Sequence, residues 1–192
     1  MQISPTLAAV ALGAAIASAP AVAQDVYVLD TNHTIPRYEV THMGFSQQYG
    51  SFTNATGKVT LDRAARKGAI EVTIMTASVT TGAARLVPHL KGEDFFNVEK
   101  YPTMTYKSAD LLFDGDNVVG ANGELTMLGV TRPVPLTVTG FKCGPHPFNK
   151  KPMCGAEAVA TIKRSEFGMK YGIPTAASDE IRITIPIEAL KE

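Results

Sequence analysis

Residues 181–188 read IRITIPIE, so isoleucine occupies every second position while Arg, Thr, Pro and Glu occupy the positions between. A two-residue period places successive side chains on opposite faces of a β-strand, one buried and one in water. The same alternation recurs in 71–76, 134–139 and 157–163. We therefore expect residues 26–189 to form an antiparallel, mostly-β structure.

The alternating stretches predict about eight or nine strands, and eight is about the number at which a closed barrel can hold one small ligand. The stretch Ala83–Val98 breaks the alternation, because Leu86, Leu90 and Phe95 or Phe96 recur at helix-like spacing. One or two short helices are expected there, as a cap on the barrel. Strands are expected at Tyr27–Asp30, Thr34–His42, Phe52–Leu61, Glu71–Thr76, Thr103–Phe113, Val118–Met127, Val134–Lys142, Gly155–Lys163 and Ile181–Leu190.

One strand bears on whether the barrel is hollow. Ala156, Ala158 and Ala160 share one face of it, and small side chains there would leave space in the interior. If the other face is inward, Val159 and Thr161 fill that space instead. A register slip of one residue exchanges the two faces, so the sequence leaves both arrangements open.

The N-terminal residues 1–23 have the pattern of a secretory signal peptide. An apolar run, Leu7–Ala17, is followed by Pro20 and the small-residue site Ala21–Ala23. The alternative is a membrane anchor, but the run is shorter than the roughly 20 residues that a spanning helix needs. We expect export to the periplasm and one domain over residues 24–192.

The chain has two cysteines, Cys143 and Cys154, and an exported protein matures where disulfides persist. The segment between them contains three prolines and a glycine, so a hairpin loop clamped by a disulfide is predicted. The alternative is a metal site that adds His146, which is spaced C-x-x-H from Cys143. A closed zinc site needs about four ligands, and no fourth one lies nearby in sequence.

Charge and motifs exclude several classes of protein. The 18 Lys and Arg balance 18 Asp and Glu, which is unlike the basic footprint of a nucleic-acid-binding protein. His33, His42, His89 and His146 form no metal or catalytic motif, and no G-x-S-x-G, H-E-x-x-H or phosphate-loop sequence is present. We interpret the histidines as structural or entrance residues, and expect no metal, no enzyme activity and no cofactor.

Seven strings are distributed over essentially all of residues 24–192. The strings are YVLDTNHT (27–34), EVTHMGF (39–45), GSF (50–52), HLKGEDFFNVEKYPTMTYKS (89–108), GELTMLGVTRPV (123–134), RSEFGMKYG (164–172) and SDEIRITIPIEA (178–189). In sequence and in order they resemble the YceI-like family of periplasmic polyisoprenoid-binding proteins.

The resemblance implies a lipocalin-like antiparallel β-barrel that holds a long isoprenoid chain or a quinone in its lumen. It also implies a periplasmic protein, often a homodimer. We expect no stable membrane insertion. From alternation and residue size we expect His42 and Arg85 to lie nearest a polar head group. The lumen wall is predicted to contain Phe45, Phe52, Ile74, Leu86, Phe95, Phe96, Tyr106, Met127 and Phe167.

The function predicted from the sequence is a non-enzymatic carrier that sequesters such a lipid. One alternative is a periplasmic enzyme, a hydrolase or metal-dependent catalyst, that uses His42 or His89. Another is a structural or stress-response partner protein whose barrel is solid. The carrier requires a hollow apolar interior, whereas the solid barrel predicts a large exposed apolar patch instead.

Overall fold

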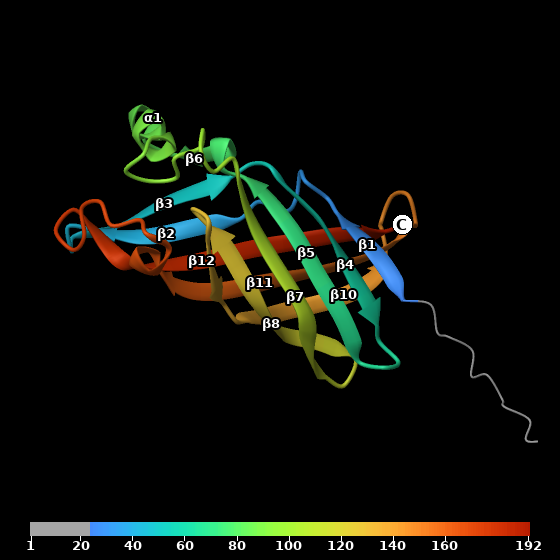
Figure 1. The fold of residues 1–192 in the computed structure, drawn as a ribbon. Coiled ribbons are helices and arrows are strands. Elements are labelled where there is room, and N and C mark those ends of the chain that lie inside the picture. Colours follow the sequence, from blue (N-terminus) through green and yellow to red (C-terminus); the bar gives the residue numbers. More distant parts are fainter. Residues whose placement is uncertain (1–23) are drawn as a thin grey trace, which may run out of the picture.

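The computed structural model describes residues 24–192, which form a sheet of twelve strands, and the alternating stretches supply most of them (Figure 1). Eight strands follow one another around a ring, and antiparallel pairing of β1 with β12 closes it, which confirms the predicted all-β barrel. The predicted signal peptide, residues 1–23, lies outside the described residues. In order around the ring the strands are β1 (Asp25–Leu29), β4 (Ala55–Asp62), β5 (Lys67–Met75), β7 (Thr103–Asp114), β8 (Asn117–Met127), β10 (Leu136–Pro145), β11 (Pro152–Lys163) and β12 (Ala177–Lys191).

The longest strand, β12, organises the barrel because its two edges have different partners. One edge pairs with β11 along nearly its whole length. On the other edge, the N-terminal half pairs with β2 (Arg37–His42), and only Ala189–Lys191 pair with β1. The strands β2, β3 (Ser46–Phe52) and β6 (Val79–Thr81) therefore extend the wall beyond the closed ring at one end.

The predicted helices form a cap over that extension. A 3-10 turn, η2 (Ala84–Leu86), leads into the short helix α1 (Val87–Lys91), which lies next to β6 in Figure 1. Leu90 and Phe96 are buried, and the Phe96 ring meets the ring of Phe52 edge-on at 5.1 Å between centroids. Apolar contact with the end of β3 thus holds the cap in place.

Three strands, β3, β6 and β9 (Val130–Pro133), are absent from the sequence prediction. The predicted strand Phe52–Leu61 is two strands, because the chain turns between Phe52 at the end of β3 and Ala55 at the start of β4. Most of β3 is polar and exposed, so it has no alternation to detect. The strands β6 and β9 are too short to show a period, and β9 pairs only with β8.

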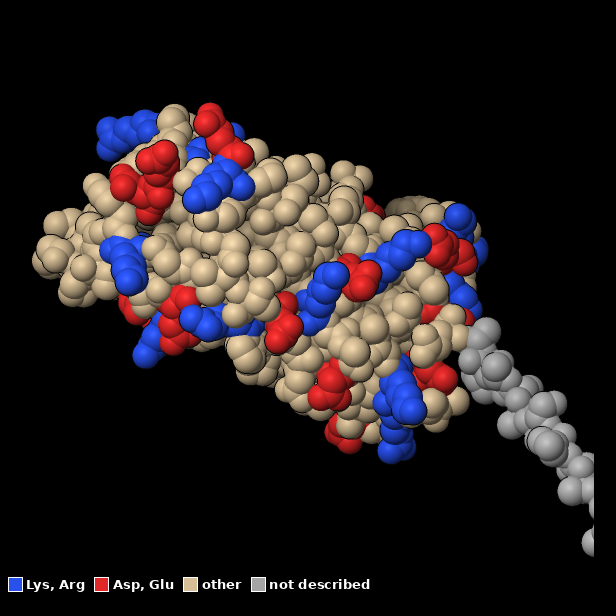
Figure 2. All heavy atoms as spheres, in the orientation of Figure 1, with Lys and Arg blue, Asp and Glu red and all other residues tan. Residues whose placement is uncertain are grey.

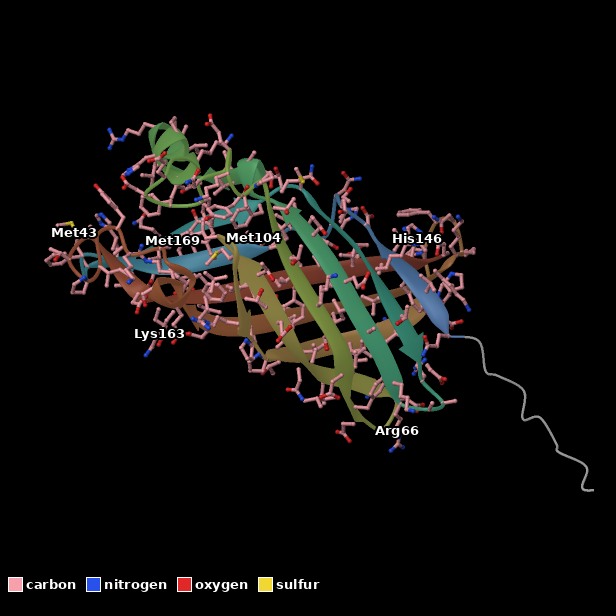
Figure 3. The ribbon with its side chains drawn as sticks, viewed as in Figure 1. Met43, Arg66, Met104, His146, Lys163 and Met169 are labelled. Atoms are coloured by element: carbon pink, nitrogen blue, oxygen red, sulfur yellow. A yellow bond between two sulfur atoms is a disulfide. The ribbon has the colours of Figure 1, made fainter. Side chains whose placement is uncertain are left out.

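The two ends of the molecule are built differently. Met43 lies in the turn between β2 and β3 at one end, and His146 lies in the β10–β11 loop at the other (Figure 3). Cys143 and Cys154 face each other across β10 and β11 and form the predicted disulfide. Because both sulfur atoms are in that bond, the alternative metal site with His146 is excluded.

Charged side chains of both signs are interspersed over the face in Figure 2, and none of them forms a broad single-sign field there. The equal numbers of acidic and basic residues make the net charge zero, and on this face neither sign is segregated. The structure offers no extended basic track on this face.

Candidate functional site: a ligand cavity in the barrel

The interior of the barrel contains a cavity of about 440 Å³. Pockets that hold small-molecule ligands typically measure about 300 to 1,000 Å³, so this space is large enough for one. Its presence contradicts the solid-barrel alternative. Inward-facing residues at every second position of the strands form the wall, as the two-residue period predicts. On β12 they are Ile181, Ile183, Ile185 and Ile187, and on β5 they are Ile70, Val72 and Ile74.

The alanine face of β11 is the inward one. Ala160 and Ile162 line the cavity, and Ala158 is fully buried, whereas Thr161 is exposed. Ala160 pairs with Ile183 of β12, so a methyl group stands beside an isoleucine on the wall. Small side chains at this point of β11 leave room in the lumen, which settles the question that the sequence left open.

Eight of the predicted site residues lie on the cavity wall. They come from five strands and from the cap, and their arrangement follows the alternation of the strands. These eight are His42, Phe52, Ile74, Leu86, Phe95, Phe96, Tyr106 and Met127.

The structure places the other three predicted residues away from the cavity. Phe45 is 91% exposed in the turn after β2, where no strand period fixes its direction. Arg85 is exposed on η2, and its neighbour Leu86 is the residue that faces the lumen. Phe167 is buried in η3 (Arg164–Phe167), close to β9 and outside the lumen wall.

Four side chains with polar atoms, His42, Gln48, His89 and Arg164, lie at one end of the cavity, which we call the polar end. His42 is paired with Ala177 of β12, and the carbonyl of Ala177 accepts a hydrogen bond from Arg164. The side chains that line the rest of the wall are mostly apolar. A bound lipid would therefore find polar partners mainly at this end.

At the polar end, aromatic side chains of the cap contact Tyr171, which lies in the loop before β12. The imidazole of His89 on α1 lies 4.9 Å from the ring of Phe95 and 5.0 Å from the ring of Tyr171, measured between centroids. Its Nε2 is 3.0 Å from a carboxylate oxygen of Asp94. These contacts connect the cap with Tyr171, which also lines the cavity.

Two tyrosines supply polar atoms to the wall between the ends. Burial raises the pKa of Tyr38 and of Tyr106 to about 12, so both phenols are neutral at physiological pH. The hydroxyl of Tyr106 donates a hydrogen bond to the carbonyl of Val134 at 3.0 Å. With that donor satisfied, the ring of Tyr106 serves as apolar wall.

Sequence reasoning did not assign Arg164 to the site, although the signal was present. Positions 160 and 162 of β11 face inward, and the same two-residue step leads to position 164, the first residue of η3 directly after β11. Because charged residues are mostly exposed, Arg164 was not considered as a residue of the cavity wall. The same parity would have assigned it to the wall.

One group of possible metal ligands occurs within residues 24–192, and it lies outside the cavity. Asp30, His33 and Glu188 bring their ligand atoms within 4.8 Å of one another at the surface. The Nδ1 of His33 is 2.8 Å from Asp30, and this hydrogen bond raises the pKa of His33 and lowers that of Asp30. The group is explained as an exposed ion pair.

Within residues 24–192, no helix has the length and apolar character to cross a bilayer. A family model described as the YceI-like domain matches residues 27–189. A curated relative, a UPF0312 protein of Pseudomonas aeruginosa strain LESB58, is 33% identical over 194 residues, with both chains covered completely.

Solved structures share the fold. BcnA of Burkholderia cenocepacia has a TM-score of 0.70 at 25% identity, over 83% of this chain and 98% of BcnA. A domain from Saccharophagus degradans, described as polyisoprenoid-binding, has a TM-score of 0.62 at 15% identity, over 86% of this chain and 98% of that domain. At that identity the second likeness concerns the fold alone.

Proposed function

The chain belongs to the YceI-like domain family, and from this membership and the cavity we propose that it is a non-enzymatic binding protein of the periplasm. It sequesters a long-chain isoprenoid or quinone-like lipid in the barrel lumen. The observation that carries the proposal is the apolar cavity of about 440 Å³ inside a closed barrel. The lipid is the only bound group that we expect, and no further cofactor is required.

The energetics of the cavity favour a long apolar chain. Each methylene group that moves from water into an apolar lumen contributes about 0.8 kcal/mol, so about ten buried carbons contribute about 8 kcal/mol before the costs of association. The isoleucines of β12 from Ile181 to Ile187 cover six residue steps, roughly 20 Å along the strand. An extended tail can therefore contact the wall over most of its length.

One structural neighbour supports a lipid ligand, and the disulfide supports export from the cytoplasm. The S. degradans domain is described as polyisoprenoid-binding, in agreement with the isoprenoid that the resemblance of the sequence to the YceI-like family implies. The disulfide Cys143–Cys154 is consistent with export, because such bonds persist in oxidising compartments. Periplasmic location and a homodimer are the further parts of the proposal. Cell fractionation and sedimentation equilibrium measure them.

The direct experiment is to purify the exported protein without detergent, extract it with organic solvent and identify the extract by mass spectrometry. We expect about one long-chain lipid per barrel. A second sample, delipidated and then incubated with membranes of the expression host, should recover the same lipid. Repeated isolation of protein without lipid, together with no uptake by the delipidated sample, would contradict the proposal.

The enzyme alternative retains one supporting observation, since His42 and His89 both line the cavity. It predicts that the lipid is chemically changed and that replacing either histidine by alanine stops this change without affecting uptake. A binding protein returns the loaded lipid unaltered from wild type and from both variants. Mass spectrometry of a defined lipid before loading and after release distinguishes the two.

A further inference from the structure

Arg164 is a buried cation on the cavity wall whose hydrogen bonds are incomplete. The residue is 3% exposed. Its Nε donates to the carbonyl of Ser178 at 2.9 Å, and its Nη2 donates to the carbonyl of Ala177 at 3.2 Å. A guanidinium carries about five N–H donors. Among the described residues Nη1 has no hydrogen-bond partner, so this side of the group is unsatisfied.

The charge of Arg164 also has no direct counter-ion. In residues 24–192, no carboxylate oxygen lies within the 4.0 Å of an ion pair with its guanidinium. The nearby acid, Asp179, makes no direct ion pair with Arg164: its two oxygens accept hydrogen bonds from the amide and the hydroxyl of Ser165 at 2.9 and 2.7 Å, and its charge acts on the guanidinium only at longer range. Burying a cation without such a partner is costly, which makes the site a natural receptor for an anionic group.

The position of Arg164 fits one end of a long ligand. It follows Ala160 and Ile162 at the same parity, and all three line the cavity. The apolar side chains Ile181–Ile187 continue from the polar end along the lumen. A head group at Arg164 would thus place its tail against the isoleucines of β12.

We propose that Arg164 anchors the ligand through its guanidinium group, and that the barrel prefers lipids whose head group has an anionic oxygen, a carboxylate or a phosphate. This inference rests on the proposed lipid-binding function and narrows its ligand class. The charge-assisted hydrogen bond is formed inside the barrel, where water competes poorly for the donor.

A purely structural role for Arg164 makes a different prediction. Its bonds to Ala177 and Ser178 join η3 to the start of β12, so replacing it could loosen the barrel. A loosened barrel loses affinity for every lipid alike, whereas a lost anchor affects only the charged ones. The experiment therefore compares ligands that share a tail and differ in head charge.

Delipidated wild-type protein is titrated by calorimetry with geranylgeranyl phosphate against geranylgeraniol, and with palmitate against methyl palmitate. We expect the charged member of at least one pair to bind about tenfold or more tightly than the neutral one, as a hydrogen bond to a charged group allows. The pair with the larger ratio distinguishes a phosphate from a carboxylate head group. This comparison needs no variant.

The variants then locate the preference. Arg164→Gln should weaken the charged ligands by about tenfold or more and change the neutral ones by less than about threefold. Arg164→Lys, which keeps the charge, should retain part of the preference. The control is Lys163→Gln, because Lys163 is the exposed neighbouring cation and points away from the barrel in Figure 3. It should leave all four affinities unchanged.

Equal binding of charged and neutral partners by wild type would overturn the inference, and so would an equal loss of both in Arg164→Gln. If Arg164→Gln does not fold, the inference is still tested by the ratio of charged to neutral ligand affinity in the wild type and by the same ratio in Arg164→Lys. Failure of all four lipids to bind would instead refute the proposed lipid-binding function, so the two failures are distinguishable.

Discussion

Placing a phenyl ring at Ala160 tests whether the lumen is a functional space. Ala160 lines the cavity on β11 and is 8% exposed. Ala160→Phe adds a ring of about six carbons, which would displace a similar number of ligand methylenes at about 0.8 kcal/mol each. The variant should therefore lose up to about 5 kcal/mol of binding free energy, more than about a thousandfold in affinity.

The effect of Ala160→Phe on the free energy of unfolding should differ from the effect of the same substitution in a packed core. Adding a large group to a filled interior costs about 1 to 3 kcal/mol of unfolding free energy or more. In a cavity of about 440 Å³ the new ring has room and buries apolar surface. We expect Ala160→Phe to be as stable as the wild type or more stable when denatured by urea without lipid.

The matched control is Thr161→Phe, one residue along the same strand. Thr161 is exposed and pairs with Arg182 on the outer face of β12. The lipid affinity of Thr161→Phe, measured by the same calorimetric titration, should equal that of the wild type. Wild-type affinity in Ala160→Phe, or a loss of stability in that variant without lipid, would show that the reasoning about a hollow barrel is wrong.

Three further predictions concern stability and titration. Replacing both Cys143 and Cys154 by serine should lower the free energy of unfolding by about 3 kcal/mol, because the bond closes a loop of about 12 residues; a loss below about 1 kcal/mol in urea titrations would contradict this. The imidazole of His33 should titrate by NMR above its ordinary pKa of 6.5, since Asp30 accepts a hydrogen bond from it, and Asp30→Asn should remove the elevation. The ion pair thus stabilises the fold at pH below 6.5, and this contribution is lost as the pH rises through the elevated pKa of His33. If Asp30→Asn left the pKa of His33 unchanged, the pairing would be refuted. Ultraviolet titration should find that the phenol of Tyr106 ionises near pH 12. The free energy of unfolding should fall as the pH rises above 10, because the unfolded state releases that proton at lower pH than the folded state. Ionisation of this phenol near pH 10 in the folded protein would refute its burial.

The strands that the sequence predicts well are those with one face in the lumen and one in water. The isoleucines of 181–187 keep their period because every second position of β12 meets apolar space. The strand β3 was missed because Ser46–Gln48 are polar and exposed, so its pairing with β2 supplies the order that its own residues do not encode. Neighbouring strands rather than local pattern decide such a segment.

The same distinction explains which site residues could be predicted. Ile74, Tyr106 and Met127 lie in regular strands, where parity fixes the direction of the side chain, and all three face the cavity. Phe45 and Phe167 lie in a turn and a 3-10 helix, where the size of a residue carries no information about its direction. Residue type was thus a weaker guide to the wall than position within a strand.

Strand β12 connects the closure of the barrel with the polar end of the cavity. Its last residues, Ala189–Lys191, close the ring on β1, and its first residues, Ala177 and Ser178, hold the guanidinium of Arg164 through their carbonyls. The isoleucines between these two regions line the lumen. A ligand that satisfies Arg164 and fills the lumen would therefore contact the strand on which ring closure depends. Since a ligand that binds only the folded state stabilises it, by about 2.7 kcal/mol at a hundred times its Kd, loading with lipid should also strengthen the barrel.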